Sequence, residues 1–134
     1  MKSVEHLPLY DKVQKTFHYK FGKFFVFDGY VISEINEGVI YSWENHAQLV
    51  TSDISNYLND YTDLVYISHR IYSYSVVPND WIKFFRNQFD LKAYAVVGYT
   101  DGGFLNMMIE NLFFKKKIRR FTDLNQAINW AETI

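Results

Sequence analysis

The chain has 134 residues, enough for one domain that buries a substantial core without covalent cross-links. Its formal net charge of −1 excludes the large basic excess of a general nucleic-acid binder, and the absence of cysteine excludes disulfides, thiol catalysis and thiolate metal sites. No apolar run approaches the ~18 residues of a membrane span, and the N-terminus lacks the apolar core of a signal peptide. We therefore expect a cytoplasmic protein without a transmembrane segment.

Aromatic residues supply an unusual share of the expected core. The chain contains 12 Phe, 11 Tyr and 3 Trp, and each such side chain buries ~150–250 Å². Packing in the core explains this richness, and an aromatic-lined ligand pocket is the alternative.

The first part of the chain predicts three strands joined by short turns. Polar and apolar residues alternate over 13–19, which is the pattern of a strand with one buried face. An apolar run at 24–27 and a β-rich run at 30–35 follow, and the Asp28-Gly29 pair between them is a hairpin turn signal. Residues 1–11 precede these strands as a lead-in segment.

The rest of the chain predicts alternating helices and strands. Apolar residues at spacings of three and four indicate helices, and short runs of β-branched and small residues indicate buried strands. Ser42 and Thr122 are placed to cap the first and last helix, and Pro78 to open the second. The predicted elements are a helix over 43–59, a strand over 64–68, a helix that begins at Pro78, a strand over 93–98, a helix over 105–115, a strand over 118–121 and a final helix from Leu124.

The element order is therefore β-β-β-α-β-α-β-α-β-α. Strands joined by short turns must be antiparallel, whereas strands joined through a helix are parallel with right-handed crossovers. The sequence predicts the α/β class, with a mixed sheet, helices on its faces and 118–121 at one edge.

The strand at 64–68 leads into a row of polar and aromatic residues. Open α/β domains bind ligands where buried strands end and loops lead into helices. We expect His69 and Arg70 to bind an anionic group near the helix that begins at Pro78. The alternative is that Arg70 pairs with an internal carboxylate and that His69 is a surface or satisfied histidine.

Tyrosines and serines alternate just beyond, at Tyr72, Ser73, Tyr74 and Ser75. If the strand continues, the tyrosines lie on one face and the serines on the other. The tyrosines then wall a pocket with their hydroxyls pointing inward. The alternative is a strand end with packed tyrosines and solvated serines.

Two carboxylates, Glu34 and Glu37, lie near the end of the third strand. Paired carboxylates can act as general acid and base. Charged groups are rarely buried, so a turn with solvated acids is the favoured interpretation.

A basic run occupies 115–120, with five positive charges in six residues. Cations are favourable at the end of the helix over 105–115, and Arg119 and Arg120 on an edge strand oppose aggregation. A contact with a partner or an anionic lipid is the alternative.

The chain resembles the SpoIIAA-like branch of the STAS superfamily in three features. These are the element order, the helix-strand-loop-helix region around 64–85, and the closing segments 113–115 and 121–131. Many members end in a short strand followed by a helix in which an Ala-Ile pair precedes a Trp, as Ala127, Ile128 and Trp130 do here. The resemblance implies a small non-enzymatic domain. Its fold would be related to anti-sigma-factor antagonists and would share features with CRAL-TRIO lipid-binding domains.

Antagonists of that kind are switched by phosphorylation of a serine in the region that here holds Ser73 and Ser75. The resemblance therefore implies these two serines as possible phosphorylation sites. Where the antagonists have Asp-Ser-Ser-Gly, this chain has Tyr74 before Ser75 and Val76 after it.

We expect a non-enzymatic regulatory or interaction module without a cofactor or metal, which binds a protein partner or a small apolar or anionic ligand at the loop after Ser68. One alternative is a carrier of an apolar or acyl, lipid-like ligand, suggested by the aromatic content. Another is a small hydrolase or isomerase that uses Glu34 or Glu37 as a base. Exposed aromatic residues are compatible with a homodimer.

Overall fold

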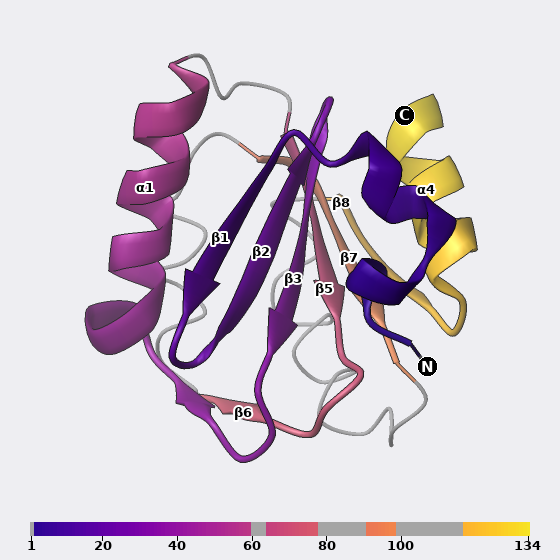
Figure 1. Ribbon diagram of the computed structural model, residues 1–134. Coiled ribbons are helices and arrows are strands. Elements are labelled where there is room, and N and C mark those ends of the chain that lie inside the picture. The colour runs from indigo at the N-terminus through magenta and orange to yellow at the C-terminus, as the bar shows by residue number, and fades with distance from the viewer. Residues whose placement is uncertain (1, 60–63, 78–90, 99–116) are drawn as a thin grey trace.

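The computed structural model describes residues 2–59, 64–77, 91–98 and 117–134 (Figure 1). Six strands form one mixed sheet in the order β1-β2-β3-β5-β7-β8, which confirms the predicted α/β class. The pairs β1–β2 and β2–β3 are antiparallel, and the pairs β3–β5, β5–β7 and β7–β8 are parallel. The bounds are β1 (Lys15–Tyr19), β2 (Gly22–Phe27), β3 (Tyr30–Ile35), β5 (Leu64–His69), β7 (Leu91–Val97) and β8 (Lys117–Phe121).

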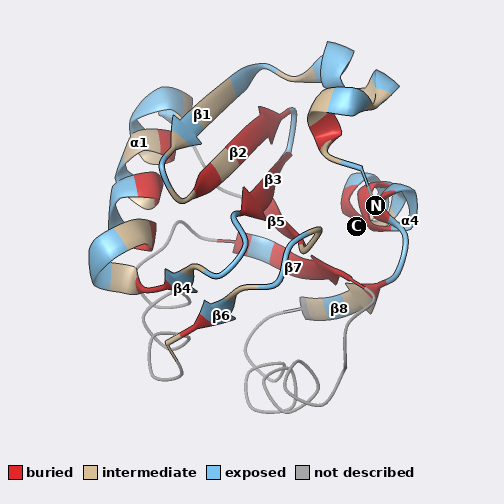
Figure 2. Ribbon diagram, turned by 60° about the horizontal axis from the view of Figure 1, so that its bottom comes forward, coloured by how far each residue is buried: buried red, intermediate tan, exposed pale blue. Residues whose placement is uncertain are grey.

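Helices cover both faces of this sheet (Figure 1). The helix α1 (Gln48–Leu58) packs on one face, and α4 (Leu124–Thr133) packs on the other beside two 3-10 helices, Val4–His6 and Pro8–Lys12. Side chains alternate along a strand, so the strands contribute residues to two apolar cores, one on each face of the sheet. Figure 2 shows the result, with the central strands β2, β3 and β5 almost wholly buried.

A second, two-stranded parallel sheet lies beyond the ends of β3 and β5 (Figure 1). It consists of β4 (Ile40–Tyr41) and β6 (Ser75–Val76). Strands of two residues carry no periodic signal, so the sequence pattern did not predict them. Their pairing holds together the two loops that leave the carboxyl ends of β3 and β5.

The helix boundaries agree with the predictions except at the starts. The Ser42 cap is confirmed, since its Oγ accepts the Asn45 N–H at 3.1 Å. The first turn, Trp43–Ala47, is π-helical, and α1 begins only after it. The prediction that Thr122 caps the last helix is wrong, because the Asp123 carboxylate accepts the Asn125 N–H at 3.0 Å. The helices predicted to begin at Pro78 and to span 105–115 lie outside the described residues.

Strand boundaries and the N-terminal segment also show small departures. The first strand begins at Lys15 rather than at residue 13, and β5 runs one residue further, to His69. The segment 1–11 is more than a lead-in, because Val4 is fully buried in the core on the α4 face. The strand predicted over 118–121 is β8, which begins at Lys117 and is one of the two edge strands of the described sheet, as predicted.

The register between β3 and β5 positions the site. Ser33 pairs with Ser68 in this parallel ladder. The next residue of each strand, Glu34 and His69, therefore lies beside the other on the α4 face.

Gly22 is required where β2 passes the end of β3. A Cβ at this position would lie 2.6 Å from the Glu34 carbonyl oxygen and 3.0 Å from the Ile35 Cα. Both are backbone atoms, so we expect Gly22→Ala to lower the free energy of unfolding by ~1–3 kcal/mol in urea denaturation. The matched control is Gly98→Ala, whose Cβ meets, among the described residues, the Arg70 side chain and carbonyl at 3.4 Å or more. Equal unfolding midpoints for the two variants would contradict this role of Gly22.

Candidate functional site

A buried hydrogen-bonded pair of side chains joins the ends of the two central strands. Glu34 and His69 are 3% and 2% exposed, and His69 Nδ1 lies 3.0 Å from Glu34 Oε2. The same oxygen accepts the Val4 N–H at 2.8 Å, and Oε1 accepts the Ser3 hydroxyl at 2.6 Å. One carboxylate therefore ties β5 and the N-terminal segment to β3.

The hydrogen bonds keep the Glu34 carboxyl ionised. Burial by itself raises the pKa of a carboxyl group, but the hydrogen bonds from His69, Ser3 and the Val4 N–H outweigh burial and lower the pKa of Glu34 below its ordinary value. An ionised carboxylate only accepts hydrogen bonds, so Nδ1 of His69 carries a hydrogen. The other ring nitrogen, Nε2, is then the atom of His69 that is left for a ligand.

His69 also lines a pocket of about 410 Å³ between the N-terminal segment and the start of α4. Within the described residues, its Nε2 has no hydrogen-bond partner. The position suits a small ligand, because it lies at the carboxyl ends of parallel strands. The apolar residues of the pocket lining are Leu7, Pro8, Leu9 and Leu124, and its polar residues besides His69 are Lys2, Thr122, Asp123 and Asn125.

The Arg70 side chain packs against the loop that follows β5. Its guanidinium donates to the Tyr74 carbonyl at 2.6 Å, and its Cζ lies 4.0 Å from the centre of the Tyr74 ring. The Tyr74 hydroxyl in turn lies 3.0 Å from the Ser68 Oγ. These contacts fix the loop after β5. The expected anion site near Pro78 involves residues outside the described ranges, so it stays a prediction.

The residues after Arg70 lie apart from the buried pair. Because β5 ends at His69, the expected strand alternation does not continue from it. Tyr72 is 46% exposed, and Ser73 and Ser75 are exposed as well. The Ser73 N–H donates to Glu37 Oε1 at 3.1 Å. Glu37 thus holds this loop.

Aromatic packing dominates the opposite face of the same strands. The Tyr66 and Tyr94 rings stack with their centres 5.1 Å apart, and Tyr41 meets Tyr74 edge-on at 6.3 Å. Burial raises the pKa of Tyr41, Tyr66 and Tyr94 well above the ordinary value, so these hydroxyls are neutral. The rings fill this face by packing on one another.

The structure brings His69 together with a residue that the sequence interpretation had placed elsewhere. Glu34 was interpreted as a solvated acid in a turn, and that interpretation is wrong: it is a buried residue of β3. Glu37 is exposed, and within the described residues the two carboxylates share no hydrogen-bond partner. The overlooked signal is a repeated pattern, Ile-Ser-Glu at 32–34 and Ile-Ser-His at 67–69, which places both charged residues at equivalent positions of adjacent strands.

The chain matches no family model, no curated protein and no solved structure. Its resemblance to the STAS superfamily therefore rests on the sequence pattern. In the part of the chain that the structure describes, no group of side chains is arranged to hold a metal ion. No helix there is both long and apolar enough to cross a bilayer.

Replacing Glu34 by glutamine removes the charge toward which three donors point. We expect the E34Q protein to lose about 3 kcal/mol of unfolding free energy at neutral pH, as measured by urea denaturation. The pKa of Glu34 is lowered in the folded protein, so its carboxylate stabilises the fold above the ordinary pKa of 4.5. That contribution disappears as the pH falls below this value through the lower folded-state pKa.

The difference between the wild-type and E34Q proteins should therefore shrink in acid. Glu37→Gln is the matched control, because Glu37 is exposed and accepts one backbone N–H. Its effect should be small at every pH. A wild-type to E34Q difference that is as large at about pH 3 as at pH 7 would contradict the assignment.

Proposed function

We propose that this protein is a non-enzymatic, STAS-like binding and regulatory module whose small ligand occupies the pocket beside His69. The observation that carries the proposal is the buried imidazole, oriented by Glu34 and facing a pocket of about 410 Å³. A volume of this size lies within the range of small-molecule sites, roughly 300–1,000 Å³.

The lining indicates the class of ligand. Leu7, Leu9 and Leu124 suit an apolar body, and Nε2 of His69 offers a polar atom for a hydrogen bond. Lys2 and Asp123 bring one charge of each sign to the lining. A small amphipathic molecule with a hydroxyl or amide donor next to an apolar ring or chain meets these requirements. This class includes short acyl compounds, as in the carrier alternative.

The polar side chains Glu34 and Arg70 are already bonded within the protein, which supports ligand binding rather than catalytic turnover. Glu34 accepts three hydrogen bonds within the protein, and Arg70 is held by the carbonyl and ring of Tyr74. Groups that are already paired are positioned, but they have little freedom to exchange protons with a substrate.

A small enzyme is the second candidate, because a carboxylate that orients an imidazole is also the arrangement of a general base. In that case Nε2 of His69 would take the proton, with Glu34 as the positioning residue. Hydrolysis of activated esters or lactones that is abolished in His69→Gln and retained in His18→Ala would favour the enzyme over the binding module.

The regulatory part of the proposal concerns Ser73 and Ser75, both of which are exposed. A phosphate on Ser73 would add about −1.5 to −2 charges beside the Glu37 carboxylate that accepts its N–H. The repulsion would weaken the contact between the loop after β3 and the loop after β5. In that contact the Gly38 N–H also donates to the Ser73 carbonyl at 2.8 Å. Mass spectrometry of protein from its own host measures whether either serine is modified.

The ligand proposal is tested by screening a library of small fragments against the 15N-labelled full chain by NMR. Fragments of the stated class should produce saturable shifts of the His69 and Asn125 backbone amide signals. Asn125→Trp puts an indole on an exposed part of the pocket wall, and we expect it to weaken binding about tenfold or more. His18→Ala, an exposed histidine on β1, should leave the dissociation constant unchanged. A library without any saturable shift at His69 would overturn the proposal.

A further inference from the structure

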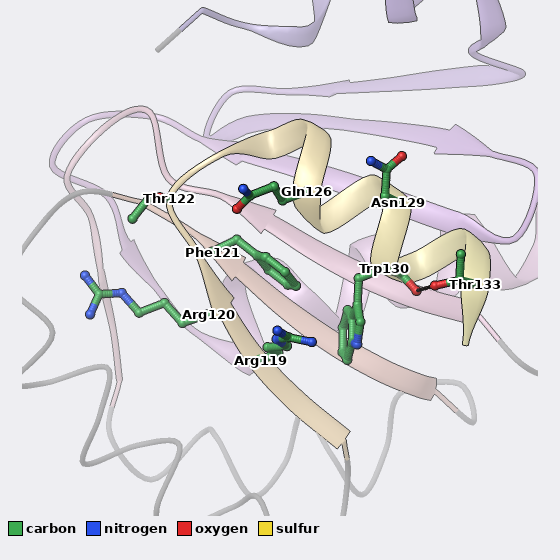
Figure 3. A pocket seen from close by; sticks show the side chains of 8 residues that line it. All are labelled: Arg119, Arg120, Phe121, Thr122, Gln126, Asn129, Trp130 and Thr133. Atoms are coloured by element: carbon green, nitrogen blue, oxygen red, sulfur yellow. Dashed lines mark hydrogen bonds between the residues drawn. The ribbon is translucent and has the colours of Figure 1, made fainter.

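A second concave surface lies at the sheet edge, between β8 and α4 (Figure 3). This groove has a volume of about 750 Å³ and shares only Thr122 with the lining of the His69 pocket. In the close-up, Trp130 extends from α4 toward β8, and Arg119 lies beside it. The proposed ligand site makes no use of this surface.

The groove combines aromatic rings with positive charge. The Phe121 and Trp130 ring centres are 5.6 Å apart, and the Arg119 guanidinium lies 5.3 Å from the centre of the Phe121 ring. The lining contains two arginines, Arg119 and Arg120, and no acidic residue, in a chain whose net charge is −1. Among the described residues, Arg119 forms no ion pair. The charge of this groove therefore favours an acidic partner.

The strand that forms one wall of the groove is the last strand of the sheet. β8 pairs with β7 along one edge, and no strand of the described residues pairs with its other edge. Such an edge presents backbone N–H and C=O groups that can bind an added strand. Gln126, Asn129 and Thr133, at spacings of three and four along α4, line the groove above it and offer polar contacts to that strand's side chains.

We propose that the groove between β8 and α4 is a docking site for an extended acidic segment of a partner protein. The segment pairs with the outer edge of β8, and a carboxylate of the segment binds Arg119, which lies on the same face of β8 as Phe121. Backbone pairing supplies affinity, and Arg119 with Trp130 selects an acidic and an apolar side chain of the segment. A concave groove suits a chain segment better than a flat lipid surface, because Trp130 lies within the groove lining.

The test uses a phage library of random nine-residue peptides, panned on the immobilised full chain. Panning is repeated on the Arg119→Glu and Lys15→Glu proteins. Lys15 is a matched control, since it lies on β1 at the opposite edge of the sheet, with its ammonium 5.5 Å from the Phe17 ring two residues on. Circular dichroism confirms that each variant is folded, and Arg119→Ala replaces Arg119→Glu if the latter is not.

We expect acidic peptides to be enriched on the wild-type and K15E proteins and at least about tenfold less on R119E. A synthetic copy of an enriched peptide should shift the NMR signals of the 117–121 backbone amides and of the Trp130 indole N–H. The proposal is overturned if no peptide is enriched, or if acidic peptides bind R119E equally well. Sedimentation with phosphatidylglycerol vesicles that requires Arg119, without peptide enrichment, would instead assign the groove to anionic lipid.

Discussion

One buried carboxylate holds together parts of the chain that are far apart in sequence. Glu34 bonds to Ser3, Val4 and His69, which are separated from it by 31, 30 and 35 residues. Removing an ion from water costs several kcal/mol unless hydrogen bonds replace its hydration. The ionised state therefore requires all of these donors at once. The N-terminal segment, β3 and β5 are positioned by the same requirement, and the pocket beside His69 is formed where they meet.

The same strands become polar at one end only. In β3 and β5, apolar residues precede the polar pairs, Ser33 with Glu34 and Ser68 with His69. Alternation sends the serines to the tyrosine-lined face and the charged residues to the α4 face. In these two strands the polar residues thus lie at the carboxyl end, where α/β domains bind their ligands. Elsewhere the two strands are free to form a continuous apolar core.

Much of this fold follows from local sequence patterns, and the parts that do not are determined by tertiary contacts. The strand run 30–35, the turn at Gly29 and the Ser42 cap were predicted from residues close in sequence. Asp123 and Thr122 are both good capping residues, so the sequence pattern did not distinguish which of the two begins the last helix. The two-residue strands β4 and β6 exist only because distant loops meet.

The sequence pattern directed attention to His69, which is the last residue of β5, but its partner Glu34 was not identified. General statistics of burial place a glutamate such as Glu34 in solvent. Only the strand register shows that it lies opposite His69, and register between parallel strands depends on a long crossover. The repeated Ile-Ser pattern at 32–33 and 67–68 contains this information, although it is recognisable only if the two strands are assumed to be neighbours.

The position of Glu34 also has a consequence for folding. The β1-β2-β3 meander is made of contacts close in sequence, whereas docking of β5 onto β3 requires closure of a much longer loop, so we expect the meander to form first. In that intermediate β3 is an edge strand, rich in apolar residues and open to pairing with another molecule. A charged side chain on an exposed edge opposes such pairing. We therefore expect Glu34 to oppose self-association of the incomplete sheet until it forms its hydrogen bond with His69.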